Sequence, residues 1–238
     1  MKSIILTAML AGILGLNSIS APAQTAAAVP ASAAADKQPV ALEKHIKPVL
    51  AALRLNDAAK AAKVHDILAA QFTALRAWHA ENDARIKPLW KEFNQARAAK
   101  NAANADAALA KIDGVYAAFQ PQHQKFLAEL ATVLTPAQIE TVKDVLTVNK
   151  VKVTYKVYRQ IFPALTDAQK AVVLQKLKAA REQAIDCEAM SEKSAFFKKY
   201  KIQIEDGYLT AQGYNPQQAR RDFAAKQKAA AKKKAVRD

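Results

Sequence analysis

The chain has 238 residues, and 36 lysines and arginines against 21 aspartates and glutamates give it a net charge of +15. A single cysteine, Cys187, excludes an internal disulfide framework. Only five glycines stand among many alanines, lysines and leucines, which excludes a turn-rich β protein. The composition predicts an all-α fold, a single helical domain of about six to eight helices with one long N-terminal helix, held by packing and capping.

The first residues have the pattern of a secretory signal peptide. A short basic start at Lys2 precedes an apolar run over 4–16, and Ala21-Pro22-Ala23 fits a small-residue cleavage site. We therefore expect a signal peptide at 1–23, a mature chain from Gln24, and export to the periplasm or the extracellular space. The apolar run is short for a membrane span, so an uncleaved anchor is the alternative. Residues 24–39 are rich in alanine with Pro30, which predicts a disordered linker.

Apolar spacing and proline positions predict a helical domain over 40–223. The longest helix is expected from Asp57 to about Lys100, where apolar residues recur at spacings of three and four, and Pro88 should kink or split it. We expect a turn at 101–106 and an extended segment at 148–154. The remaining helices are expected at 40–53, from the turn to about 133 with an interruption near Pro121, and at 136–147, 155–162, 167–187, 192–212 and from Pro216 onward.

Four short polar residues are predicted to cap helix starts. The pentapeptide Leu-Thr-x-Ala-Gln occurs at 134–138 and again at 165–169, and in each copy the threonine is an N-cap with glutamine three residues later. A looser copy begins at Leu55. The predicted caps are Asn56, Thr135, Thr166 and Asn215.

Two resemblances follow from these motifs. The repeated Leu-Thr-x-x-Gln in an exported helical protein resembles the Spy/CpxP group of periplasmic chaperone-like proteins. A broader likeness spans about 50–223 and includes Ala77-Trp78-His79, 134–144, 153–158 and Gln212-Gly213-Tyr214; over these segments the chain resembles domain-of-unknown-function family 3826. That resemblance implies an exported bacterial protein, with sugar binding suggested as its role and no catalytic residues to carry over.

Catalytic and metal-binding patterns are weak. The chain has no Gly-rich phosphate loop, no Gly-x-Ser-x-Gly and no Cys-x-x-Cys. His65-Asp66 and His79 with Asp83 could each offer an imidazole and a carboxylate to a metal, but the two histidines lie about 21 Å apart along one helix. We expect no metal, no cofactor and no catalytic residue. Glu182/Asp186 and Glu205/Asp206 are expected to be salt-bridged surface pairs, and Cys187 an inert, half-buried thiol, with an intermolecular disulfide as its alternative.

The aromatic residues of the C-terminal half are the better candidates for a binding site. Sugars stack on aromatic rings and are held through their hydroxyls by charged and amide side chains. Tyrosines that flank expected loops, together with polar neighbours, form the predicted ligand-binding set: Tyr155, Tyr158, Arg181, Asp186, Lys199, Tyr214 and Asn215. The alternative for each ring is a place in the core.

Positive charge is concentrated in a basic tail over 224–238, with Lys226, Lys228, Lys232, Lys233, Lys234 and Arg237. We expect an anionic envelope surface as its partner, and no nucleic acid because the protein is expected to be exported; a solubilising tail is the alternative. The excess charge also favours an acidic carbohydrate over a neutral one. The expected function is a noncatalytic, carbohydrate-related binding or accessory role in polysaccharide utilisation. The alternatives are a Spy/CpxP-like chaperone or envelope-stress protein, and an enzyme acting on polysaccharide.

Overall fold

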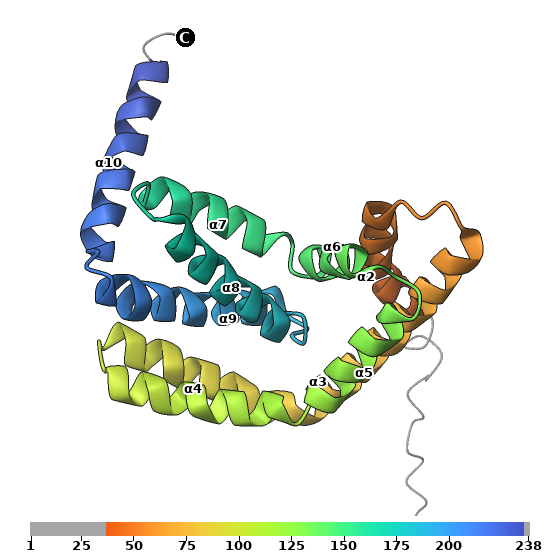
Figure 1. Ribbon diagram of the computed structural model, residues 1–238. Helices are drawn as coiled ribbons and strands as arrows, with labels where there is room; N and C mark the ends of the chain where they lie inside the picture. The colour runs from red at the N-terminus through yellow and green to blue at the C-terminus, as the bar shows by residue number, and fades with distance from the viewer. Residues whose placement is uncertain (1–36, 236–238) are drawn as a thin grey trace, which may run out of the picture.

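The computed structural model describes residues 37–235, and within them the chain forms nine α-helices, one π-helix and no strand (Figure 1). The expected all-α domain is therefore confirmed. The elements are α2 (Lys37–Leu53), α3 (Ala58–Ala98), α4 (Ala102–Ala117), α5 (Gln120–Ala131), α6 (Pro136–Leu146), α7 (Lys150–Ile161), α8 (Asp167–Ala184), α9 (Met190–Ile202), the π-helix η1 (Gln203–Leu209) and α10 (Pro216–Ala235).

Some expectations fall outside the described residues. The expected signal peptide at 1–23 and most of the expected linker, 24–36, lie there, as do 236–238 of the tail. None of the helices in the described range combines the length and apolar character needed to cross a membrane.

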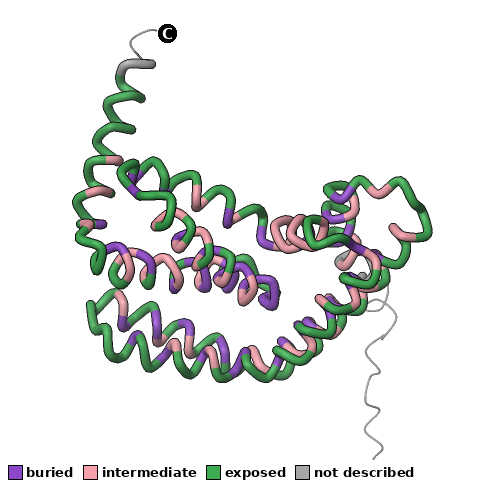
Figure 2. The backbone as a smooth tube through the Cα atoms, viewed as in Figure 1, coloured by how far each residue is buried: buried purple, intermediate pink, exposed green. Residues whose placement is uncertain are grey.

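The long helix is confirmed, and it organises the molecule. α3 runs unbroken through Pro88, so the proline does not split it. Its first half packs with α2, α5 and α6 around one apolar core that includes Ile46, Leu68 and Phe126. Its second half packs with α4, α7, α8 and α9 around a larger core. In Figures 1 and 2, α4 and α5 follow α3 along its length, and the buried residues face inward between the helices.

Two boundary predictions are wrong. The segment expected to be extended at 148–154 is mostly helical, since α7 begins at Lys150. Its alternating valines satisfy a helical pattern as well, because Val151, Tyr158 and Ile161 lie at spacings of seven and three and are all buried. The turn expected at 101–106 is shorter, because the side chain of Asn101 accepts the Asn104 N–H and starts α4 at once.

Three of the four predicted caps form. Thr135 and Thr166 each accept the amide of the glutamine three residues on, and that glutamine accepts the threonine amide in return. Asn215 accepts the Gln218 amide at 3.0 Å. Asn56 is wrong as a cap: Asp57 is the cap of α3 and accepts the Lys60 amide at 3.0 Å. Asn56 and Asp57 are adjacent and both residue types favour the cap position, and the helix begins one residue later than expected.

Candidate functional site: a polar pocket beside the end of α8

A pocket of about 340 Å³ lies where α4, α5, α8 and α9 meet. Apart from two alanines its lining is polar or aromatic: Asp113, Tyr116, Ala117, Gln120, His123, Ala179, Glu182, Gln183, Asp186 and Tyr200. We call this the polar pocket. Two helix faces build most of it, because 113, 116 and 117 on α4 share the spacing of 179, 182 and 183 on α8. Residues at i, i+3 and i+4 share one helix face, so two such faces turned toward each other line a common space. Gln120, at the start of α5, and Asp186, in the turn after α8, extend the lining.

A buried histidine–aspartate pair forms the inner wall of the polar pocket. The His123 Nδ1 atom lies 2.9 Å from one Asp186 carboxylate oxygen and 3.1 Å from the other. Both side chains are almost fully buried, with 4% and 2% of their surface exposed. Burial raises the pKa of Asp186 above its ordinary value, although the contact with His123 acts in the opposite direction. The Glu182/Asp186 pair is therefore not the exposed surface pair that was expected, because Asp186 is buried.

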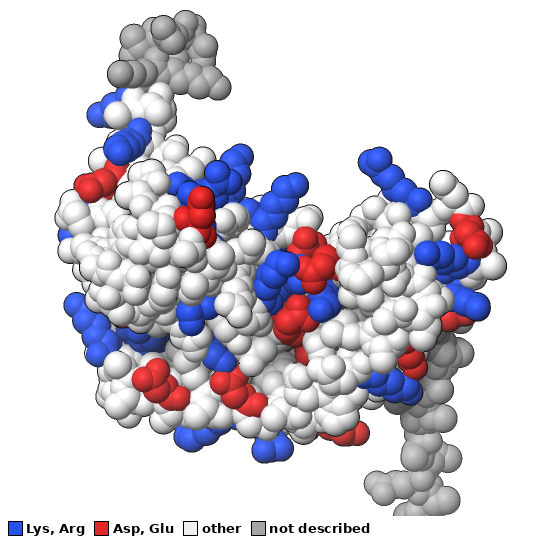
Figure 3. Space-filling model, viewed as in Figure 1, with Lys and Arg blue, Asp and Glu red and all other residues white. Residues whose placement is uncertain are grey.

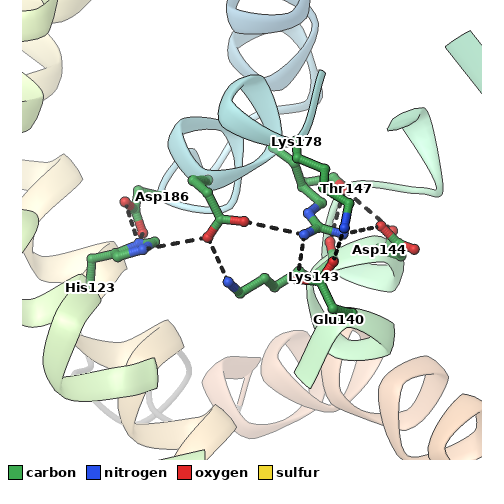
Figure 4. Close-up of polar contacts among 9 residues, drawn as sticks. His123, Glu140, Lys143, Asp144, Thr147, Lys178 and Asp186 are labelled. Carbon is green, nitrogen blue, oxygen red and sulfur yellow. Dashed lines mark hydrogen bonds and ion pairs between the residues drawn. The ribbon is translucent and has the colours of Figure 1, made fainter. Parts of the chain in front are cut away.

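The outer wall is held by a network of charges that reaches α6. Glu182 Oε2 lies 3.8 Å from His123 Nε2 and 2.7 Å from Lys143 Nζ. Its other oxygen accepts a hydrogen bond from Arg181 at 3.3 Å. Figure 4 shows the contacts running from His123 and Asp186 on one side to Lys143 and Asp144 on the other. In the space-filling view, charged side chains of both signs gather where the two halves of the molecule meet (Figure 3).

Arg181 is a fully buried cation of this network. Its guanidinium donates to Asp144 at 2.6 Å and to Glu140 at 2.7 Å, and only 2% of its side chain is exposed. Burial alone would raise the pKa of Glu140, but the hydrogen bonds from Arg181 and Lys178 outweigh it and the pKa is lowered. Arg181 thus ties α8 to α6 and faces away from the polar pocket.

A second ion pair, between Lys199 and Asp113, fixes the wall of the pocket formed by α4 and α9. Lys199 Nζ lies 2.5 and 2.7 Å from the two oxygens of Asp113 and donates to the Gln183 amide oxygen at 3.3 Å. The same ammonium lies 5.4 Å from the centre of the Tyr200 ring. Burial raises the pKa of the Tyr200 phenol. The polar atoms on this wall are therefore held in fixed directions before any ligand arrives.

The family model described as "Protein of unknown function (DUF3826)" matches residues 41–229. The chain belongs to this family. Comparison with curated proteins finds no match. The expected family membership is confirmed, while the likeness to the Spy/CpxP group stays a prediction.

In this DUF3826 protein the predicted ligand-binding residues do not form one site. Asp186 lines the polar pocket, and Lys199 lies outside the lining but pairs with Asp113, which does line it. Tyr158 is only 1% exposed and its hydroxyl donates to the Glu205 carboxylate, within the larger core. Tyr155 lies on the same helix, α7, which replaces the loop that these two tyrosines were expected to flank.

Tyr214 and Asn215 lie at the start of α10. The Tyr214 hydroxyl donates to the Ala164 carbonyl at 3.1 Å, and Asn215 caps the helix, so both have structural partners. Of the residues that line the polar pocket, the sequence analysis named only Asp186 as a binding residue and missed the polar residues of the two helix faces. Their signal was present as Asp113 and Tyr116 on one helix and Glu182 and Gln183 on another, but nothing in the sequence showed that the two faces meet.

The DUF3826 chain has a second pocket of about 340 Å³, and this one is mainly apolar. It lies between α2, α3 and the link from α6 to α7, and Phe72, Leu146 and Val148 are among the residues that line it. Val148 and Met190, at its rim, are 53% and 46% exposed. We call this the apolar groove. Cys187 also lines it, but the residue is 1% exposed and so more deeply buried than the half-buried thiol that was expected; burial raises its pKa.

Proposed function

We propose that this protein is exported and binds carbohydrate without catalysis, and that the polar pocket is the binding site. The observation that carries the proposal is the lining, which sets the Tyr116 and Tyr200 rings among carboxylate and amide groups held in fixed directions. A cavity of this volume lies within the range of small-ligand sites. A sugar has an apolar ring face and a rim of hydroxyl donors. The tyrosine rings of the pocket can stack on the ring face, and its carboxylate and amide groups can accept from the hydroxyls.

The carboxylates of the pocket suit the recognition of hydroxyls. Lys199 holds Asp113, and Lys143 and Arg181 hold Glu182, so these groups are paired with cations and keep lone pairs for further hydrogen bonds. A sugar hydroxyl that donates to such a carboxylate makes a charge-assisted hydrogen bond, which is stronger than a neutral one. These side chains are already ordered in the folded protein, so ligand binding loses little of their conformational entropy, which favours affinity.

The local charge favours a neutral sugar over an acidic one. Three carboxylates line the pocket, from Asp113, Glu182 and Asp186, and the ten lining residues, all within the described range, include no lysine or arginine. The cations that contact these carboxylates, Lys199, Lys143 and Arg181, are already paired, so a uronate carboxylate would meet further carboxylates and no lysine or arginine within the lining. The net positive charge of the chain is a property of the whole surface, and it does not set the preference of this pocket. We therefore propose a neutral sugar in place of the acidic ligand that the overall charge favoured.

Binding is favoured over catalysis because the pocket's carboxylates already have partners. A general acid or base must be free to contact the reacting atoms of the substrate, whereas the Asp113 and Glu182 carboxylates are already in contact with Lys199 and Lys143. Asp186 has a raised pKa, but it is 2% exposed and in contact with His123. A polysaccharide-acting enzyme remains the competing function, and product analysis in the same samples would reveal it.

The proposal is tested by calorimetric titration of the mature chain with neutral oligosaccharides and with oligogalacturonate. Tyr200→Ala should weaken binding of a neutral sugar by about fivefold or more, the loss expected for one aromatic contact. Tyr155→Ala is the matched control, a half-buried tyrosine outside the pocket, and it should leave affinity unchanged. Circular dichroism checks that each variant is folded. No heat at millimolar sugar, or equal losses in both variants, would overturn the proposal.

The apolar groove favours a second candidate function, that of a Spy/CpxP-like chaperone. Exposed apolar side chains at its rim, Val148 and Met190, suit a partly unfolded client more than a sugar. If this function holds, the double variant Val148→Gln, Met190→Gln should suppress aggregation of a denatured client less well than the wild type does. Tyr200→Ala should leave that activity intact. The opposite pattern, or no activity in the wild type, would count against it.

A further inference from the structure

A second cluster of polar groups lies between α3 and α9, outside the polar pocket. His79 and Asp83 stand one turn apart on α3, and Glu192 lies in the first turn of α9. One side-chain donor atom from each residue lies within 4.8 Å of the other two. The His79 Nδ1 atom is 2.8 Å from Asp83 Oδ1. His79 is 1% exposed and Glu192 7%, so both side chains are withdrawn from water.

The opposite nitrogen of His79 is placed as it is in metal-binding histidines. Nε2 lies 3.1 Å from the Asp186 carbonyl oxygen and 3.2 Å from the Glu188 amide nitrogen. With Nδ1 protonated, Nε2 accepts from the Glu188 amide and Nδ1–H donates to Asp83. With Nε2 protonated, Nε2–H donates to the Asp186 carbonyl, and the Nδ1 lone pair faces the carboxylate. The second arrangement is the one that orients a metal ligand, since a ligating histidine commonly donates its other ring N–H to a backbone carbonyl or carboxylate.

The charges around the cluster leave room for a cation. Among the described residues the Glu192 carboxylate accepts one hydrogen bond, from the Ala189 amide at 3.3 Å. Lys87 pairs with the second oxygen of Asp83 at 2.7 Å, but its side chain is 70% exposed and can move into solvent. Two carboxylates and an imidazole then face one another, and each of these groups can donate a lone pair to a dication.

We propose that His79, Asp83 and Glu192 bind a divalent transition-metal ion, with Zn²⁺ as the preferred ion. One nitrogen and two carboxylate oxygens suit Zn²⁺ at bond lengths of about 2.0–2.2 Å, and three protein ligands leave a fourth position open. Ligand atoms at these bond lengths on a tetrahedral ion lie roughly 3.3–3.6 Å from one another. The His79 and Asp83 atoms, now 2.8 Å apart, would therefore have to separate slightly, and donor atoms as much as 4.8 Å apart would have to approach. Ca²⁺ and Mg²⁺ are disfavoured, because they prefer sites made wholly of oxygen.

The site also has a structural consequence. A metal on these ligands would join α3 to the start of α9 and fix His79 against the turn at 185–189. That turn carries Asp186, whose carboxylate lines the polar pocket, so the two sites share one backbone segment. The proposal itself does not depend on sugar binding, and it is tested without a sugar.

The test is titration of chelator-treated full-length protein with Zn²⁺, Mn²⁺, Ca²⁺ and Mg²⁺ by calorimetry, with thermal unfolding followed at rising Zn²⁺. We expect one Zn²⁺ per chain, weak or no binding of Ca²⁺ and Mg²⁺, and an unfolding midpoint that rises with Zn²⁺. Glu192→Gln keeps an oxygen for the Ala189 amide and should weaken Zn²⁺ binding about tenfold or more. Asp83→Asn, a change at a partly exposed side chain, should do the same if the first variant proves unfolded.

His65 provides the matched control. Its imidazole also lies between two carboxylates, 2.6 Å from Glu43 and 3.1 Å from Asp66, but 36% of the side chain is exposed and both ring nitrogens face side chains. His65→Gln should leave Zn²⁺ binding unchanged. The absence of Zn²⁺ binding, its loss in His65→Gln, or full affinity in folded Glu192→Gln and Asp83→Asn would each overturn the proposal. Absorption by bound Co²⁺ that disappears in Glu192→Gln would support it independently.

Discussion

Short polar side chains fix where several helices of this protein begin. Asp57, Asn101, Thr135, Thr166 and Asn215 each accept a backbone N–H from the first turn of the helix that follows. Those N–H groups have no partner within the helix, so each cap satisfies a donor that would otherwise depend on water. These are local interactions between residues three apart, and their energies should be nearly independent of one another.

Removal of a cap should cost stability at the positions that the structure identifies. Asp57→Ala, Thr135→Ala and Thr166→Ala should each lower the free energy of unfolding by about 1 kcal/mol. Asn56→Ala is the control, and it should change stability by less than about 0.5 kcal/mol, because its neighbour is the cap. Urea denaturation measures all four. An Asn56 variant that loses as much as the Asp57 variant would show that α3 begins one residue earlier.

The contact between His65 and Glu43 should make stability depend on pH. The hydrogen bond that Glu43 accepts from His65, followed by the one that Asp66 accepts, raises the pKa of His65 above its ordinary value. A raised histidine pKa stabilises the fold fully below the unfolded value of about 6.5, and this contribution is lost as pH rises through the higher folded value. The urea midpoint of the wild type should therefore fall more between about pH 5.5 and about pH 8.5 than that of His65→Gln. Equal changes in both proteins would contradict this prediction.

At the scale of elements, the junction between α6 and α8 depends on one buried cation. α6 belongs to the core around the first half of α3, and α8 to the core around the second half. Arg181 crosses between them and binds two carboxylates of α6, Glu140 and Asp144. The burial of the guanidinium and its hydrogen bonds to two separate carboxylates distinguish this contact from the exposed ion pairs elsewhere on the helices.

Arg181→Met should destabilise the protein by about 2–3 kcal/mol, because it removes two charge-assisted hydrogen bonds while the carboxylates left behind, 40% and 32% exposed, regain water. Lys178→Met is the matched control on the same helix. Lys178 also pairs with Glu140, at 3.0 Å, but it is 49% exposed, so its loss should cost about 1 kcal/mol or less. Chemical denaturation of both variants measures the difference. Similar costs in the two would mean that burial of Arg181 does not govern the strength of the junction.

At the scale of the whole molecule, the last helix, α10, extends from the folded body and carries many basic residues. It points away from the body in Figure 1, and lysine and arginine side chains lie along it in Figure 3. Ala219 and Phe223 pack against the larger core, whereas the residues beyond them are exposed as far as the burial of side chains is described. The basic tail over 224–238 holds six basic residues and one acidic residue.

Removal of residues 224–238 should abolish binding to anionic lipid vesicles while the body stays folded. Each basic residue near a negative surface contributes about 1 kcal/mol, and salt screens the attraction within about 10 Å. Sedimentation with vesicles at low and high salt measures the effect. A variant with arginine at each tail lysine keeps the charge and should still bind. Salt-independent binding, or unchanged binding after truncation, would contradict the prediction.

Much of the fold follows from the sequence, because helix signals are local. Caps, prolines and apolar spacing determine most helix positions, and these depend on residues within a few positions of one another. The exceptions are short segments where two local patterns compete. Val148 and Asn149 have positive φ angles of 48° and 55°, and they absorb the change of direction between α6 and α7 that the sequence analysis assigned to an extended segment. The tyrosines of α7 therefore lie on a helix, and Tyr158 enters the core.

The sequence by itself determined the helical class, the family likeness and three of the four caps that it predicted, since each rests on neighbouring residues. Only the tertiary structure decided which polar residues meet. Asp113 and Gln183 are 70 residues apart, and His79 lies more than 100 residues from the turn at 185–189, yet each pair is within hydrogen-bond distance. A sequence pattern records which face of a helix a residue occupies, but the partner of that face depends on how the helices pack. The polar pocket and the His79 cluster both arise at that level.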